Sequence, residues 1–250
     1  MSESNDRAKA ADTIYVAGLT DDKCDPELGE KVKTYLRSLS LENTYHCKDP
    51  AHEHGLAPSY EPKAAFKSLQ EGVYMAYKML GLDVENDPSI KDTPKRFAKM
   101  FVGELTKGLN YDFFPRCTAQ PNGTYVEQPN PSYKAWEQGT RPGLPEPAFK
   151  PAKTLKVLTG AYNEMVHMRK IRTTSLCEHH LQTIDGYTHI AYIPGPTIIG
   201  LSKLARVTEF FAARPQIQER MTEQIYAALK CILQTDDIAV VQDCVHFCMR

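Results

Sequence analysis

The chain has 250 residues, 42% of them hydrophobic and 24% charged, and its formal net charge at pH 7 is −1. A chain of this length can bury a substantial core, as one large domain or two small ones. Its near-neutral charge argues against a general nucleic-acid or membrane-surface binder, and no apolar run approaches a membrane span. The start shows no secretory signal. The seven cysteines, an odd number, indicate thiols in a reducing cytoplasm rather than a disulfide framework.

The first 61 residues are predicted to form an arm with one helix. Residues 1 to about 24 are polar, and we expect them to be mobile. Asp25 is expected to cap a helix that has Pro26 in its first turn and runs to about Leu39. The loop that follows holds a second group of possible metal ligands, His46, Cys47, His52 and His54. Their irregular spacing matches no closed zinc site, so solvated side chains are the default interpretation and a second metal site is the alternative.

Two helices are predicted between residues 62 and 116. From Pro62 to Leu80, apolar residues recur with the period of a helix. Thr93 is expected to cap the second helix, which ends at Gly108.

Residues 117–152 have a different character. They are rich in proline, show little periodicity and contain the only tryptophan, Trp136. This composition predicts a long surface insertion, as a partner-binding or lid segment.

Residues 153–250 predict an α+β unit, because strand patterns are followed by two helices and a further strand. Residues 155–176 are expected to form one long strand or a bent pair, and residues 187–194 another. The last strand is expected to begin near Ile238 and to carry candidate metal ligands.

Two helices are predicted between these strands. Ser202 is expected to cap the first, which ends near Arg214. Pro215 is expected to open the second, which runs to Leu233.

The candidate chemistry centres on Ser175-Leu-Cys-Glu-His-His180. Cys177 and His180 stand at i and i+3, and on a helical turn this spacing brings a thiolate and an imidazole to one side. His179 stays within a few ångströms and is free to move protons beside a metal. Taken alone, the spacing is a weak signal, and ordinary core or surface residues are the alternative.

A third ligand is available near the end of the chain. On one strand, Cys244, His246 and Cys248 would face the same side, since residues two apart share a face. Cys177, His180 and Cys248 would make a Cys2His set with one open position, which is the pattern of catalytic zinc. A core strand that carries buried cysteines is the alternative.

The start of the first predicted helix of residues 153–250 carries Ser202, Lys203 and Arg206. The two cations share a face and the helix N-terminus adds positive charge, a combination that suits a phosphate chain. A solvated basic helix face is the alternative. In the next helix, Gln218 precedes Glu219, whose carboxylate could accept two parallel bonds from guanine; an exposed glutamate is the commoner case.

Several of these stretches occur together and in a fixed order. They are Asp92-Thr-Pro-Lys-Arg-Phe-Ala-Lys-Met100, Ser175 to His180, Thr183-Ile-Asp-Gly186, Ala191-Tyr-Ile-Pro194, Gly200-Leu-Ser-Lys203, Phe210 to Arg220 and His246-Phe-Cys248. This set closely resembles the GTP cyclohydrolase I family. The resemblance covers roughly residues 62–116 and 161–250.

The resemblance implies the tunnelling (T-fold) architecture, an antiparallel sheet with helices packed on one face, preceded by an N-terminal helical region. It also implies a homo-oligomer, typically a toroidal decamer, with active sites at subunit interfaces. The implied reaction converts GTP and water to 7,8-dihydroneopterin triphosphate and formate, the first step of pterin and folate-type biosynthesis.

The resemblance also assigns roles by position. It implies that Cys177, His180 and Cys248 hold Zn²⁺, which would activate water for attack on C8 of the purine. The implied catalytic residues are His179 and His246 for proton transfer and Ser202 at the ribose. The implied substrate-binding residues are Gln218 and Glu219 at the guanine edge and Lys203, Arg206, Arg96 and Arg250 at the triphosphate.

Two departures from the family pattern matter. The family continues past the His-x-Cys strand with an arginine-glycine pair that binds phosphate, so we expect a shortened T-fold region in which Arg250 takes that role. The connection at residues 117–152 is shorter in the family. A non-catalytic GTP-binding or inactive truncated relative is therefore the alternative function. A T-fold nitrile reductase is disfavoured, because the relevant cysteines occupy zinc-ligand positions.

Overall fold

The structure is a computed structural model, which describes residues 23–41, 62–137 and 152–249. The predictions for residues 1–22, for the second Cys/His group and for Arg250 lie outside these residues. Within them, no helix combines the length and the apolar character that crossing a membrane requires.

The first helix, α2, spans Pro26–Ser38 and begins as predicted. The Asp25 carboxylate accepts a hydrogen bond of 3.0 Å from the Leu28 backbone N–H, which satisfies one of the free donors of the first turn. Val32 and Leu36 on its inner face are fully buried and belong to the main core. Burial of this face fixes α2 against a later helix, α7 (Gln218–Leu233).

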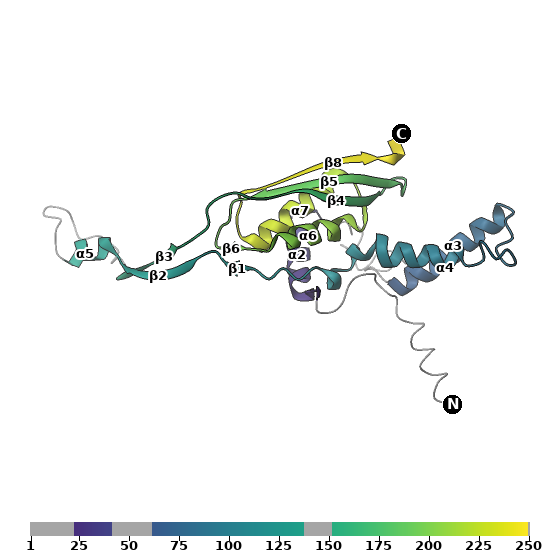
Figure 1. The fold of residues 1–250 in the computed structure, drawn as a ribbon. Helices are drawn as coiled ribbons and strands as arrows, with labels where there is room; N and C mark the ends of the chain where they lie inside the picture. Colours follow the sequence, from purple (N-terminus) through teal and green to yellow (C-terminus); the bar gives the residue numbers. More distant parts are fainter. Residues whose placement is uncertain (1–22, 42–61, 138–151, 250) are drawn as a thin grey trace, which may run out of the picture.

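The next elements form a helical hairpin. It consists of α3, Pro62–Met79, and α4, Thr93–Met100, and projects from the body of the molecule (Figure 1). The predicted Thr93 cap is wrong, because Asp92 precedes the helix and Thr93 is its first residue. The predicted end at Gly108 is also wrong. After α4 the chain forms a π-helical turn over Phe101–Leu105 and 3-10 turns over Lys107–Leu109 and Tyr111–Phe113.

The described part of the predicted surface insertion, residues 117–152, contains regular secondary structure. Strand β1, Gln120–Pro121, pairs with β6, Thr197–Ile198. Strand β2, Thr124–Pro129, pairs with β3, Thr154–Thr159, in a two-stranded arm that leaves the body (Figure 1). A short helix, α5, follows β2 at Pro131–Glu137.

The base of this arm is fixed by Asn122, which is 3% exposed. Its side-chain nitrogen donates to the carbonyls of Tyr162 (3.0 Å) and Gly195 (2.8 Å), and its oxygen accepts from the Tyr162 N–H (2.9 Å). One buried amide therefore joins three stretches of chain.

The main sheet has the strand order β7-β4-β5-β8. Strands β4, Val166–Cys177, β5, Thr183–Tyr192, and β8, Ile238–His246, are antiparallel. The two-residue β7, Pro215–Gln216, adds a short parallel pair to the end of β4. Of the two alternatives predicted over residues 155–176, the structure has a pair of strands and not one long strand, and β3 and β4 belong to different sheets.

Two helices, α6 (Leu201–Ala212) and α7 (Gln218–Leu233), cover one face of the sheet (Figure 1). This confirms the α+β class and the helices on one face. Ser202 is not the cap of α6, because Gly200 precedes the helix and accepts the Lys203 N–H at 2.8 Å. Pro215 does not open α7, because it pairs with β4 instead.

Candidate metal centre and its surroundings

Cys177 is the last residue of β4, and His180 lies in the turn that leads to β5. This connection joins two paired strands, and it contains one hydrogen bond of the helical i to i+4 type, between Cys177 and Leu181, in agreement with the expected helical turn. The Cys177 N–H donates to the Gln182 carbonyl at 2.7 Å, and the Leu181 N–H returns to the Cys177 carbonyl at 2.8 Å. Leu181 has a positive φ of 53°, which closes the turn. This ligand turn, Cys177–His180, places Cys177 inside the protein and His180 at the surface.

The third candidate ligand, Cys248, does not lie on the last strand as predicted. It sits in a 3-10 turn, Phe247–Met249, which directly follows β8. Because His246 pairs with Ile184 at the start of β5, this turn arrives beside the ligand turn. Cys244 pairs with Gly186 further along the sheet and is not part of the group.

The ligand atoms of Cys177, His180 and Cys248 all lie within 4.8 Å of one another. Zinc bonds of about 2.3 Å to sulfur and 2.0–2.1 Å to nitrogen place tetrahedral ligand atoms roughly 3.6–3.8 Å apart. The three residues therefore fit a zinc ion with a small inward movement, and they leave a fourth position open. Desolvation and the neighbouring Cys177 thiol raise the pKa of the Cys248 thiol, as expected for two thiols held side by side.

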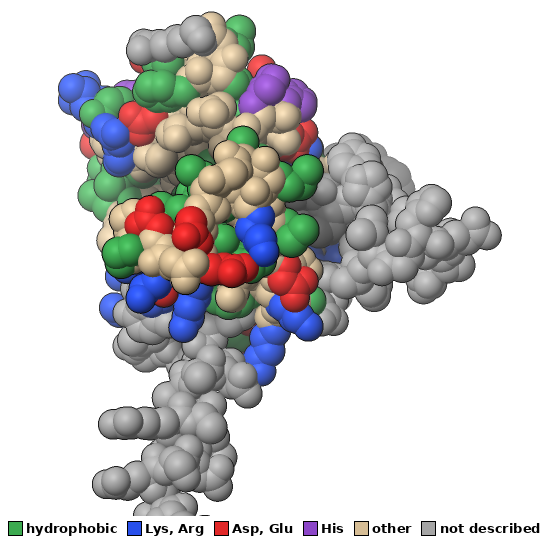
Figure 2. All heavy atoms as spheres, turned by 90° about the vertical axis from the view of Figure 1, so that its right-hand side faces the viewer, with side chains coloured by type: hydrophobic (Ala, Val, Ile, Leu, Met, Phe, Trp, Pro, Cys, Tyr) green, Lys and Arg blue, Asp and Glu red, His purple; other side chains and the backbone are tan. Residues whose placement is uncertain are grey.

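Two histidines accompany the candidate ligands. His179 is exposed, and its ring centroid is 6.2 Å from that of His180. Figure 2 looks onto the end of the molecule that carries the ligand turn, and it shows histidine side chains at the surface near the top of that face. His246 ends β8, with its Nε2 3.2 Å from the Gln218 Oε1.

The orientation of the Gln218 amide follows from its second contact. Its Nε2 lies 3.2 Å from the Gln242 carbonyl, which can only accept. The amide oxygen therefore faces His246 and accepts from its Nε2–H. This leaves Nδ1 of His246 as the basic ring nitrogen. Glu219, next to Gln218, is exposed.

The predicted phosphate-binding residues lie elsewhere in the chain. The end of α6 is tied to the ligand turn, because the Ser175 hydroxyl donates to the Arg214 carbonyl at 3.1 Å and β7 pairs with the end of β4. Ser202 and Lys203 lie at the opposite end of this 12-residue helix, which is about 18 Å long, and Arg206 lies near its middle. One chain therefore does not bring these residues to the candidate metal ligands.

The remaining predicted cations are also outside this group. Lys203 and Arg206 lie near Cys117 instead: burial raises the pKa of the Cys117 thiol to about 11, and these two cations partly oppose that rise. Arg96 is exposed on α4 and forms an ion pair of 3.5 Å with Asp92. Arg250 lies outside the described residues.

The structure also reveals an ion pair at the ligand turn to which the sequence analysis assigned no role. The carboxylate of Glu178 forms an ion pair with Arg220, which lies in the first turn of α7. Both residues belong to the recognised motifs. The only available sequence signal was their opposite charge, because their contact joins segments 42 residues apart.

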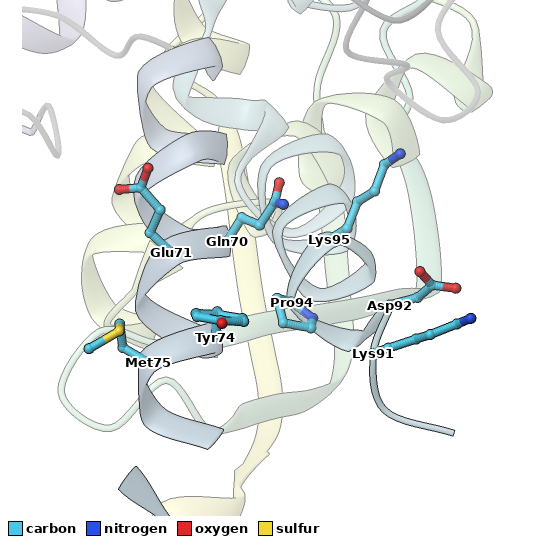
Figure 3. A pocket seen from close by; sticks show the side chains of 8 residues that line it. All are labelled: Gln70, Glu71, Tyr74, Met75, Lys91, Asp92, Pro94 and Lys95. Carbon is cyan, nitrogen blue, oxygen red and sulfur yellow. The ribbon is translucent and has the colours of Figure 1, made fainter. Parts of the chain in front are cut away.

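A separate hollow of about 480 Å³ lies between α3 and α4 (Figure 3). It is lined by Gln70, Glu71, Tyr74, Met75, Lys91, Asp92, Pro94 and Lys95. None of these eight is a predicted site residue, so this hollow is distinct from the candidate metal centre.

Fold and site together define a class, that of α+β proteins with an open Cys2His group and histidines beside it. Residues 122–250 match the family model for GTP cyclohydrolase I. The chain is 38% identical over 208 residues to GTP cyclohydrolase 1 of Vibrio cholerae serotype O1, an alignment that covers 81% of this chain and 79% of that protein. It is 41% identical over 172 residues to GTP cyclohydrolase 1 of Shewanella denitrificans, covering 69% of this chain and 62% of the relative. A third relative, GTP cyclohydrolase 1 of Yersinia enterocolitica serotype O:8, is 39% identical over 182 residues, which are 73% of this chain and 66% of that protein. The chain belongs to the GTP cyclohydrolase I family.

Proposed function

We propose that this chain is a zinc-dependent GTP cyclohydrolase I with the T-fold. It would convert GTP and water to 7,8-dihydroneopterin triphosphate and formate, the first step of pterin and folate-type biosynthesis. The observation that carries this proposal is the convergence of Cys177, His180 and Cys248 from two distant segments of the chain. The names of the relatives support GTP as the substrate.

Cys177, His180 and Cys248 would hold Zn²⁺, which when bound supplies a Lewis acid and lowers the pKa of a coordinated water. His179, exposed beside His180, would protonate N7 of the purine and so help the imidazole ring to open. His246, held by Gln218, would serve the later proton transfers. Gln218 and Glu219 would bind the guanine edge from the start of α7.

We further propose that the active site is completed by a second copy of the chain. Ser202, Lys203 and Arg206 lie about 15, 14 and 9 Å along the helix axis from the end of α6 that is tied to the ligand turn, whereas one GTP molecule must reach both groups. A homo-oligomer, of the decameric family type, would bring the start of α6 of one copy to the ligand turn of another. We also propose a cytoplasmic location, because all six cysteines of the described residues are free thiols.

The activity is tested by incubating the chain with GTP and zinc. The assay measures formate together with the fluorescence of neopterin after oxidation. Equal amounts of both, abolished by a chelator, support the proposal. The Cys177→Ala variant should lose zinc and turnover, while Cys244→Ala, a matched thiol outside the group, should keep both. GTP binding without either product would instead favour the non-catalytic alternative.

Shared sites are tested by co-expressing Cys177→Ala with Lys203→Ala. Each variant alone should be inactive. In mixed oligomers, about a quarter of the sites would combine two intact contributions and regain activity. Complete inactivity of the mixture would contradict a site shared between copies.

A further inference from the structure

The ligand turn is bound to α7 by a polar network that the proposed chemistry does not use. Glu178, between Cys177 and His179, has its backbone N–H 3.0 Å from the Gln216 carbonyl. Its carboxylate pairs with the guanidinium of Arg220. The turn is thus held to β7 by its backbone and to α7 by its side chain.

Arg220 is itself held from behind. Its Nε donates to the Gln216 Oε1 at 3.4 Å. Gln216 is fully buried, and its Nε2 donates to the Phe211 carbonyl (2.9 Å) and to the Gln224 Oε1 (2.7 Å). The Gln224 amide in turn donates to the Leu41 carbonyl, which follows α2. The network therefore ends at Phe211 in the core and at Leu41, which packs against it.

The pair is more than a solvated surface contact. The Arg220 side chain is 14% exposed and that of Glu178 is 31% exposed, so both charges are partly desolvated. A charge-assisted hydrogen bond in such surroundings is stronger and more directional than one in water. His179 and His180, by contrast, are exposed. The Glu178 carboxylate is therefore the side-chain anchor of the part of the turn that lies at the surface.

We propose that Glu178 and Arg220 are positioning residues that hold Cys177 and His180 in the geometry for metal binding. They act through the ligand turn, without contact to substrate. This inference rests on the proposed function only in taking zinc as the metal that Cys177 and His180 bind. It predicts an effect on metal affinity that is measurable without GTP.

The test uses the full chain and the variants Glu178→Gln, Arg220→Gln and the double variant. Zinc affinity is measured by competition with a chromophoric chelator. Removal of a group that orients metal ligands typically weakens metal binding about 10- to 100-fold, and we expect each single variant to lose about tenfold. The double variant should lose no more than the weaker-binding single variant, since both act through one contact. Arg220→Lys, which keeps the charge, should recover part of the loss.

The matched control is Lys230→Gln. Lys230 lies on the same helix as Arg220, ten residues or about 15 Å further along. The variant breaks the ion pair of Lys230 with Asp236, which follows the helix. Thermal unfolding of each variant without zinc separates general destabilisation from an effect on the ligand turn. Should Arg220→Gln fail to fold, the more exposed Glu178→Gln carries the test.

Two failures are distinguishable. If the unchanged chain does not bind zinc, the proposed function fails. If it binds zinc and Glu178→Gln binds as tightly as Lys230→Gln, the positioning role is refuted while the proposed function stands. The same affinity loss in Lys230→Gln would also refute it.

Discussion

A chain of buried hydroxyls in the main sheet offers a sharp test of the fold. Thr173 and Thr188 are 1% and 0% exposed, and their Oγ1 atoms are 2.6 Å apart. Thr173 uses its one hydroxyl proton on the Ile171 carbonyl at 3.0 Å, so Thr188 must be the donor between the two. Thr188 in turn accepts from the Gln242 Nε2 at 2.9 Å. The direction of every hydrogen bond in this row is therefore fixed.

The Thr188→Val variant keeps the shape of the side chain but removes the middle of the row. It leaves the Gln242 N–H without this acceptor and Thr173 without its donor, and we expect a loss of about 1–3 kcal/mol in the free energy of unfolding. Thr173→Val should cost a similar amount, because it strands the buried Thr188 hydroxyl proton. In the double variant no hydroxyl is stranded, so the loss should fall about 1 kcal/mol short of the sum.

The assay is denaturant unfolding at one protein concentration, because the proposed association of copies would contribute to apparent stability. If the slope of the free energy of unfolding against denaturant concentration is unchanged, all variants expose the same amount of surface on unfolding. Strictly additive losses would refute the fixed donor direction. A loss below about 0.3 kcal/mol for Thr188→Val would refute the buried row itself.

Three further predictions concern other parts of the chain. Leu36→Ala, in the fully buried face of α2, should lower the free energy of unfolding by about 2–5 kcal/mol in a denaturant titration. The Cys117 thiol, 6% exposed and with its pKa raised to about 11 by burial, should stay unmodified by iodoacetamide at pH 8, as measured by mass spectrometry. The hydrogen bond from the Tyr74 hydroxyl, followed by the interactions with Lys78, holds the pKa of Glu85 below its usual value of 4.5. These contacts therefore stabilise the α3–α4 hairpin above that pH, and their contribution is lost as the pH falls through the lowered pKa. Tyr74→Phe should therefore reduce the acid-induced drop in thermal midpoint.

Each of these predictions has its own control. Leu39→Ala, at a residue that is 45% exposed just after the same helix, should change stability by no more than about 0.5 kcal/mol, and an equal loss in both variants would contradict the packing of α2. Cys117 should react once the chain is unfolded in urea; rapid reaction in the folded chain would contradict its burial. An identical acid response in Tyr74→Phe and the unchanged chain would contradict the Glu85 assignment.

The features that the sequence predicted correctly depend on local patterns. The start of α2 follows from a cap and a proline at adjacent positions, and the apolar period of α3 reports its helix directly. The choice of Cys177, His180 and Cys248 as a group came from residue type and motif order. It survives although Cys248 lies in a 3-10 turn and not on the last strand, because ligand identity does not depend on whether the backbone of a ligand is extended.

The errors arise where a distant partner decides the structure. Pro215 looks like a helix start, yet its partner Leu176 lies in a strand formed 39 residues earlier. β1 has no strand pattern of its own and exists because β6 pairs with it. The ion pair of Glu178 and Arg220 also depends on a distant partner, and no periodic pattern in the sequence predicts it. Strand register and ion pairs across elements are non-local, so a one-dimensional pattern carries little information about them.

The most informative disagreement concerns α6. Its first half carries the predicted phosphate ligands and its end is tied to β4 just before the ligand turn, so the helix separates two halves of one expected site by about half its length or more. The order of motifs along the chain cannot predict this separation, because it contains no information about which end of a helix packs against which end of a sheet. If the family reaction is correct, the halves must meet across copies, and the polar network behind Glu178 then has a second meaning. It keeps the metal-binding half formed within a single chain, so that assembly has to supply only the cations.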